Sequence, residues 1–275
     1  MEQELERQII KEARERMKSR AAEEEETDYQ SDQDKKLPQP PLVKAPMRSE
    51  QIDLPRDFKP LGLEQDLLSV IVRRCSSRVY TQQPVSLLQL SFLLWATQGI
   101  KEIRGKSYAT LRTVPCGGAR HPFETYLMVR NVEGLEPGAY HYLPMSHQLE
   151  FLHPVEELDE TVNASLCGQR WAAKAGVVFY WSFVPYRSEW RYGIYAHRMV
   201  MADVGHVGEN LYLACAALGL GTCGIGAYDQ ALCDRLFELD GDEEFTLYTQ
   251  SVGAIRAEDA QEEKDFYKFV EEQGL

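Results

Sequence analysis

Residues 112–123 of this chain read Arg112-Thr113-Val114-Pro115-Cys116-Gly117-Gly118-Ala119-Arg120-His121-Pro122-Phe123. Two adjacent glycines between two prolines make a loop that holds its shape and lets a ligand approach closely, because glycine has no Cβ. Residues 125–129 follow as a buried strand rich in β-branched and aromatic side chains. We call residues 112–123 the cradle. Its pattern predicts either a platform for a flat ligand or an ordinary Pro-Gly turn.

The composition of the 275 residues bounds the class of protein. Hydrophobic residues make up 44% of the chain, which is enough for one large domain or two small ones. The net charge of −13 argues against sequence-independent binding to nucleic acid, because the phosphates would be repelled. The N-terminus has no apolar signal region, and no apolar run approaches the roughly 20 residues of a membrane span. We therefore expect a soluble cytoplasmic protein.

The six cysteines form no Cys-x-x-Cys pair and have no spacing with histidine that suits zinc. We expect reduced thiols and no metal site.

Three segments are expected along the chain. Residues 1–60 form a charged N-terminal helical arm with a narrow apolar stripe, followed by a Pro-rich, poorly ordered linker. Residues 61–256 form the globular domain, and residues 257–275 form an acidic C-terminal helix.

Hydrophobic periodicity predicts the elements of the globular domain. Expected helices cover residues 63–73, 86–98, 156–167, 196–218 and 228–238, and expected strands cover residues 124–130, 139–143, 148–152, 176–183 and 245–255. Ser86 is a suitable N-cap and Gly99 a suitable terminator for the second helix. Residues 219–226 are expected to be a glycine-rich turn.

The expected helix 196–218 carries an apolar seam with steps of four and three residues: Val200, Val204, Val207, Leu211, Ala214 and Leu218. Such a seam predicts a helix–helix contact or a subunit interface. Beside it, Asp203, His206 and Asn210 form a polar row, which we interpret as a buried polar network.

Residues 74–78 contain Arg74, Ser76 and Arg78, and we call this segment the basic cluster. Two guanidiniums beside a hydroxyl suit a phosphate and polar ring atoms, although a solvated basic turn has the same pattern. Residues 221–228 are glycine-rich but lack both the strand-first Gly-x-Gly-x-x-Gly context and the Lys-Ser/Thr of a phosphate loop.

Over residues 63–256, the order of several motifs along the chain resembles that of the FMN-dependent nitroreductase superfamily, and within it of the SagB-type dehydrogenase group. Residues 74–80 are similar to the family's Arg-x-Ser-x-Arg/Lys-x-aromatic element, and residues 115–122 to the Pro-Ser-Ala-Gly-x-x-x-Pro loop. Residues 136–142 resemble its Pro-Gly-x-Tyr-x-Tyr hairpin, residues 205–210 its Gly-His-x-x-x-Asn helix, and residues 225–228 its flavin N5 turn.

The resemblance implies an FMN site. Arg74 and Ser76 would hold the phosphate and ribityl end, Arg78 the pyrimidine edge, and Ala227 N–H the flavin N5. The full implied set is Arg74, Cys75, Ser76, Arg78, Pro115, Cys116, Gly117, Gly226, Ala227 and Arg256. Cys116 stands where serine is usual, which indicates either a small-residue substitution or a redox role.

Arg191 and Tyr192 depart from the family pattern, because the azoline-oxidising members typically carry Lys-Tyr here. Arginine cannot take the acid–base role suspected for that lysine, since its pKa stays above about 12. Either Tyr192 carries the acid–base role, or no base is needed, or Arg191 steers an anion, or the pair is an ordinary surface feature. We take Tyr192 and Arg191 as the catalytic candidates, and the departure argues against azole formation.

The sequence therefore predicts an α+β, nitroreductase-like fold with a mainly antiparallel central sheet surrounded by helices, acting as a homodimer. The implied function is an FMN-dependent oxidoreductase that shuttles electrons through flavin N5. Its substrate would be a small molecule or peptide-derived, with NAD(P)H as a candidate donor. The alternatives are a flavin-binding scaffold or partner subunit without its own turnover, and an azoline-oxidising dehydrogenase in peptide modification.

Overall fold

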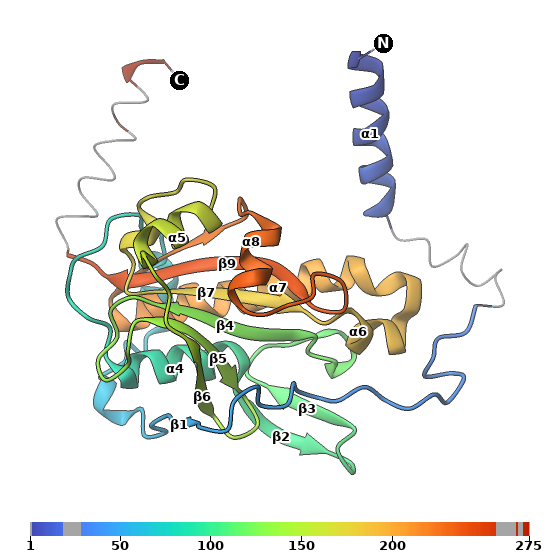
Figure 1. Cartoon of the computed structure of the whole chain (residues 1–275), viewed down its shortest axis with the longest axis horizontal. Helices are drawn as coiled ribbons and strands as arrows, with labels where there is room; N and C mark the ends of the chain where they lie inside the picture. The colour runs from blue at the N-terminus through green and yellow to red at the C-terminus, as the bar shows by residue number, and fades with distance from the viewer. Residues whose placement is uncertain (1, 19–28, 257–267, 269–271, 275) are drawn as a thin grey trace.

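The computed structural model describes residues 2–18, 29–256, 268 and 272–274 (Figure 1). The helix expected in residues 257–275 lies almost entirely outside the described residues. The centre of the molecule is a seven-stranded sheet with the order β1-β6-β5-β4-β7-β9-β8 and only antiparallel pairs. Its strands are β1 (Ile52–Asp53), β4 (Phe123–Val129), β5 (Gly138–Leu143), β6 (Gln148–His153), β7 (Val177–Phe183), β8 (Leu220–Ile225) and β9 (Phe245–Ala254).

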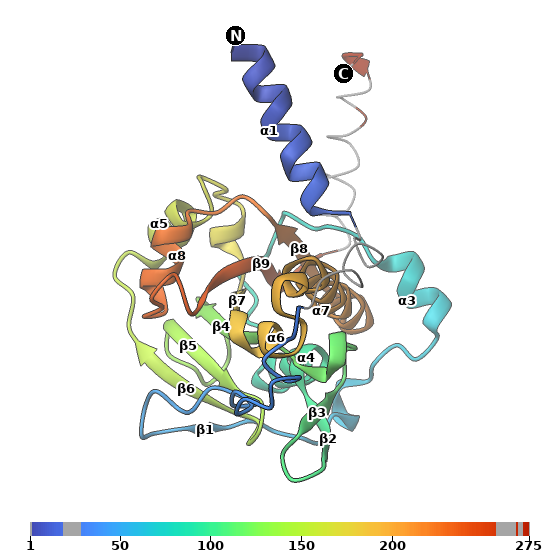
Figure 2. The same cartoon turned by 90° about the vertical axis from the view of Figure 1, so that its right-hand side faces the viewer.

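Helices cover both faces of the sheet, and a separate hairpin of β2 (Ile100–Arg104) and β3 (Ala109–Arg112) stands beside it (Figure 2). The helices are α1 (Glu2–Arg16), α3 (Leu67–Arg73), α4 (Leu87–Gln98), α5 (Leu158–Ser165), α6 (Pro185–Tyr192), α7 (Ala196–Leu218) and α8 (Gln230–Leu236). The predicted α+β fold with a central antiparallel sheet is confirmed.

The two cores follow from the two-residue alternation of side chains along each strand. On β4, Phe123 and Leu127 belong to the core beneath α4 and α7, whereas Tyr126 and Met128 belong to the core beneath α5 and α8. Every residue of β4 and β7 is therefore buried, which explains why both strands are mostly apolar on both faces.

The ends of α4 show why this segment is helical. Ser86 and Gln89 form a reciprocal capping box, which satisfies backbone donors at the first turn. Gly99 ends the helix as expected, but its φ of −60° is not left-handed. A Cβ at Gly99 would lie 2.4 Å from the Trp95 ring, so glycine is needed here for space.

Two sequence predictions about local structure were wrong. The glycine-rich turn expected at residues 219–226 is instead the edge strand β8. The helix expected from residue 63 begins at Leu67, after Asp66 caps it by accepting from Ser69 N–H, and Val70 is its one buried residue. The sequence pattern did not predict α6 or the β2–β3 hairpin.

The apolar seam of α7 packs inside the chain. Val200, Val204, Val207, Leu211 and Ala214 all belong to the core shared with α4 and the sheet. The predicted helix–helix contact is confirmed, while the seam is not available to a second subunit. Any dimer has to use other surfaces.

The segment expected as a poorly ordered linker contributes to the body. Ile52 and Asp53 pair with β6 at one edge of the sheet. Before them, residues 40–46 cross the α5/α8 face of the sheet, and we call this proline-rich segment the strap. Lys44 N–H donates to Glu124 (2.8 Å), and its ammonium donates to Glu244 (2.6 Å), so the strap covers buried carboxylates. The division into residues 1–60, 61–256 and 257–275 stays a prediction.

Candidate functional site

The cradle is anchored to α7 by one carboxylate. Gly117 N–H donates to both oxygens of Asp203, at 3.1 and 3.0 Å, and the Cys116 thiol donates to the same carboxylate at 3.2 Å. Asp203 is 6% exposed. Of the predicted polar row, Asp203 is therefore buried at the cradle and Asn210 donates to the carbonyl of Ala96, but His206 is half-exposed.

Arg191 and Tyr192, the catalytic candidates, lie directly against the cradle. A Cβ built on Gly118 would stand 2.6 Å from Arg191 Cδ, Arg191 Nε and Tyr192 Oη. Gly118 also has φ +56°, in the left-handed region that favours glycine. The cradle backbone therefore lies in close contact with the Arg191 and Tyr192 side chains of α6.

Tyr108, on the β2–β3 hairpin, joins this group. Its hydroxyl accepts hydrogen bonds from Arg191 Nη1 (2.8 Å) and from Gln33 Nε2 (3.0 Å). The Arg120 guanidinium lies over its ring at 5.0 Å. Burial raises the pKa of Tyr108, but these hydrogen bonds and the two guanidiniums lower it below the ordinary value overall.

Cys116 is a protonated thiol in this setting. Burial, and then the neighbouring Asp203 carboxylate, raises the pKa of Cys116 to about 12. The thiolate is the nucleophilic form of cysteine, so a redox role for Cys116 is disfavoured.

Alkylation tests this protonation state. At pH 8, we expect iodoacetamide to modify the exposed Cys75 and Cys167 and to leave Cys116 unmodified. Peptide mass spectrometry of the folded protein measures all three sites in one sample. Modification of Cys116 at the rate of Cys75 would show that it is an accessible thiolate instead.

His121 is buried in the cradle, and burial together with the Arg112 charge lowers its pKa to about 2. The unfolded chain takes up this proton below about pH 6.5, whereas the folded chain does not. The free energy of unfolding therefore keeps its full value above about pH 6.5, where His121 is neutral in both states. It decreases as the pH falls below that value. At pH 5.5 the expected loss is about 1.4 kcal/mol.

Urea unfolding at pH 7.5 and 5.5 measures this loss. From pH 7.5 to pH 5.5, we expect the unfolding free energy of His121→Gln to fall by about 1.4 kcal/mol less than that of the wild type. The exposed His197 provides the matched control, His197→Gln. Equal pH dependence in the wild type and His121→Gln would contradict the neutral state of His121.

The basic cluster packs against aromatic rings on the side of α7 that faces away from the cradle. The Arg74 guanidinium lies 5.4 Å from the ring centre of Tyr212, and the Ser76 hydroxyl is 3.0 Å from the Tyr212 hydroxyl. Arg78 lies 5.8 Å from the ring centre of Trp171. These half-buried contacts hold two guanidiniums in place while leaving surface for a ligand.

The late turn at residues 225–228 lies near the basic cluster. Gly224 N–H donates to the Tyr212 hydroxyl (2.7 Å), and Gln169 Nε2 donates to the carbonyl of Ala227 (3.1 Å). Gly226 and Ala227 are exposed, and a Cβ at Gly226 would meet no atom within 4 Å.

Arg256 is the second residue after the end of β9. A hollow of about 150 Å³ lies close by and is lined by Cys75, Tyr212 and Ile255, among others. The predicted cofactor residues at positions 74–78, 226–227 and 256 thus come from segments that adjoin β8 and the C-terminal half of α7.

The structure thus assembles the predicted residues in two groups. One group surrounds the cradle and contains Asp203. The other surrounds the basic cluster and contains Tyr212. The two residues are nine positions apart on α7, which places them about 13 Å apart along the axis and on opposite sides of the helix. Within one chain, α7 stands between the two groups.

Three residues of these groups were not predicted from the sequence. Tyr108, Tyr212 and Trp171 each supply an aromatic ring to a guanidinium named above. No local motif marks them, because each contact joins segments far apart in the chain. Among the described residues, no helix is both long and apolar enough to span a membrane. The same residues contain no group of three or more metal-ligating side chains placed to hold an ion.

Comparisons with known proteins agree with these motifs. A model of the nitroreductase family matches residues 71–254, which is more than half of the chain. A Methanocaldococcus jannaschii protein named as a nitroreductase is 37% identical over 182 residues, which cover 65% of this chain and 84% of that protein. The trifolitoxin-processing protein TfxB of Rhizobium leguminosarum bv. trifolii is 32% identical over 133 residues, which cover 47% of this chain and 36% of that protein.

A solved structure is similar as well. The crystal structure of a Ralstonia eutropha protein named as a nitroreductase superposes with a TM-score of 0.62 and 26% identity. The match covers 80% of this chain and 95% of that protein. With the family match, the antiparallel sheet and the ordered motifs, the chain belongs to the nitroreductase family.

Proposed function

We propose that this protein is an FMN-dependent oxidoreductase that works as a homodimer. The observation that carries the proposal is the pairing of a cation-rich, hydroxyl-bearing surface with a glycine cradle in a nitroreductase-family chain. When bound, FMN supplies a centre that accepts and releases hydride, which no side chain can do.

The residues present fit the cofactor chemically. Arg74, Ser76 and Arg256 supply cations and a hydroxyl for the phosphate end. Arg78 would face the pyrimidine edge, where a fixed cation stabilises negative charge. The open space beside Gly226 lets a ring approach the Ala227 N–H. Cys75, Pro115, Cys116 and Gly117 complete the proposed set.

A second copy of the chain would complete each site. Because α7 stands between the two groups, the cradle of one chain and the basic cluster of the other form a site across a twofold interface. Isologous dimers provide two such equivalent sites. α3 supports this interface, since its Leu67, Leu68, Ile71 and Val72 are 54–74% exposed and it packs beside α7 (Figure 2).

Peptide modification is the second candidate. Its support is the likeness to the trifolitoxin-processing protein, which covers about a third of that protein. Arg191 argues against a proton-abstracting lysine at this place, so Tyr192 or Tyr108 would have to move the proton. A scaffold or partner subunit without turnover is the alternative outside catalysis.

Turnover separates these candidates. We expect purified protein loaded with FMN to lose its yellow absorbance with NAD(P)H and to regain it with a quinone or nitroaromatic. A loaded protein that is not reduced by NAD(P)H, but is reduced by an azoline-containing peptide, would instead be the dehydrogenase. A loaded protein inert to both would be the scaffold.

Arg191→Ala should separate binding from turnover. Arg191 contacts the cradle and Tyr108 but belongs to the α6 side of the site. We expect the variant to keep its flavin and to lose at least about tenfold in kcat, equivalent to one hydrogen bond to a charged group. Flavin absorbance per polypeptide and steady-state kinetics measure the two effects. Loss of flavin, or unchanged kcat, would contradict this role.

A further inference from the structure

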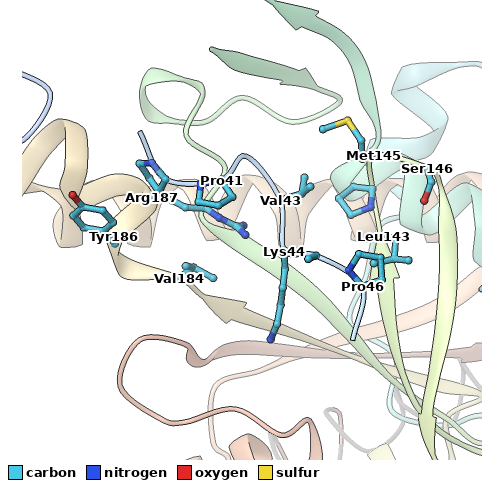
Figure 3. A pocket seen from close by; sticks show the side chains of 13 residues that line it. Pro41, Val43, Lys44, Pro46, Leu143, Met145, Ser146, Val184, Tyr186 and Arg187 are labelled. Atoms are coloured by element: carbon cyan, nitrogen blue, oxygen red, sulfur yellow. The ribbon is translucent and has the colours of Figure 1, made fainter. Parts of the chain in front are cut away.

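A second cavity lies outside both groups. It has a volume of about 620 Å³, within the range of small-molecule sites. The strap, the β5–β6 turn and the beginning of α6 line it with apolar side chains (Figure 3), including Pro41, Val43, Pro46, Leu143, Val184 and Tyr186. The prolines fix the strap backbone, so this wall keeps its shape.

The cavity lies on the α5/α8 face of the sheet and adjoins both ends of the cradle, because Arg112 Nη2 donates to the Leu42 carbonyl of the strap (3.2 Å) and Val184 N–H donates to the Pro122 carbonyl (2.8 Å). Leu143 is two residues from His141 on β5, so both side chains leave the same face of the sheet. Tyr140 and Tyr142 leave the other face, into the core beneath α4 and α7. None of the residues proposed to hold the flavin lines the cavity, although α6 carries both Arg187 of the cavity wall and the catalytic candidates Arg191 and Tyr192.

One buried cation in the cavity wall has an unused donor. Arg187 is 4% exposed, and its Nη2 pairs with Glu124 at 2.5 Å. Its Nη1 is buried without a hydrogen-bond partner in the part of the chain that the structure describes. Figure 3 shows this side chain extending from α6 toward Val43 and Lys44. Buried polar atoms are almost always paired, so an acceptor is expected here.

The surrounding charges favour an anion. Glu124 is flanked by Arg187 and His141, and Arg112 adds a further positive charge nearby. Burial lowers the pKa of His141, but its hydrogen bonds to Glu124 and Glu150 raise it above the ordinary value overall. With Lys44 and Glu244, four groups able to carry positive charge face three carboxylates.

We propose that this cavity binds a small apolar monocarboxylate. The carboxylate accepts a hydrogen bond from Arg187 Nη1, and the apolar body lies against the strap prolines, Leu143 and Val184. A neutral apolar molecule would leave Nη1 unpaired, and a polar one would find few partners among these walls. The site is separate from the proposed flavin site and goes beyond the proposed function.

Decanoate and decanol test the proposal as a matched pair of probes. By isothermal titration calorimetry, we expect the full-length protein to bind decanoate at least tenfold more tightly than decanol. Val43→Trp fills the cavity and leaves Arg187 paired with Glu124, so it should weaken decanoate binding at least tenfold. Ile103→Trp places the same ring on the exposed β2–β3 hairpin and should change nothing.

A double variant tests the carboxylate contact itself. Glu124→Gln with Arg187→Gln removes both partners together, so no buried carboxylate is left unpaired. We expect it to bind decanoate and decanol equally. Equal binding of the two probes by the wild type, or decanoate binding that survives Val43→Trp, would overturn the proposal. FMN content, measured on every sample, shows separately whether the flavin site is intact.

Discussion

Replacing both Arg74 and Arg78 by alanine is expected to give folded protein that retains no FMN. Each guanidinium would make charge-assisted hydrogen bonds to the cofactor, worth about 1.5–3 kcal/mol each. Their joint loss corresponds to roughly 10²- to 10⁴-fold weaker binding. The fold should survive, because the two residues are half-buried and their stacking on Tyr212 and Trp171 is worth about 0.5–1 kcal/mol per contact.

Flavin absorbance per polypeptide after desalting measures this effect, and circular dichroism checks the fold. Arg104→Ala is the matched control, since Arg104 is an exposed arginine on the β2–β3 hairpin. The control should retain FMN like the wild type. Full flavin content in the double variant would mean that the basic cluster is a solvated surface turn.

Gly118→Ala is expected to damage the cradle far more than Gly117→Ala does. At Gly118 the new methyl group would meet Arg191 and Tyr192 at 2.6 Å, and the left-handed backbone adds strain. We expect the unfolding free energy to fall by about 1–3 kcal/mol, and turnover to be lost because both catalytic candidates are displaced.

At Gly117, a Cβ would come closest to Met199 Cε, at 2.3 Å. This methyl group is the flexible end of its side chain and can move away, and Gly117 has no positive φ. Gly117→Ala should therefore stay close to the wild type in urea unfolding. Equal destabilisation by the two alanines would contradict both the contact with α6 and the backbone strain assigned to Gly118.

Most of the sheet and its helices could be predicted because their side-chain periods are local. β8 could not, since its glycines suggest a turn. In the structure they serve packing: a Cβ at Gly221 would lie 2.3 Å from Ile255, and one at Gly224 would lie 2.0 Å from the Tyr248 hydroxyl. Neighbouring strands and side chains impose this requirement, which the local pattern cannot reveal.

Motif order predicted the cradle, the basic cluster and the pair Arg191 and Tyr192 as candidates, but it predicted neither their aromatic partners Tyr108, Tyr212 and Trp171 nor the arrangement of the groups. The contact between Gly117 and Asp203 spans 86 residues, and only the fold shows that one carboxylate anchors the cradle. No local pattern indicates that α7 separates the cradle from the basic cluster. The separation depends on the direction and rotation of one helix in three dimensions.

The most direct test of FMN binding is the absorbance spectrum of the purified protein after incubation with FMN and desalting. We expect a retained flavin spectrum approaching one FMN per chain, and light scattering should give the mass of a dimer. A folded protein that stays colourless and takes up no FMN would contradict the flavoenzyme proposal.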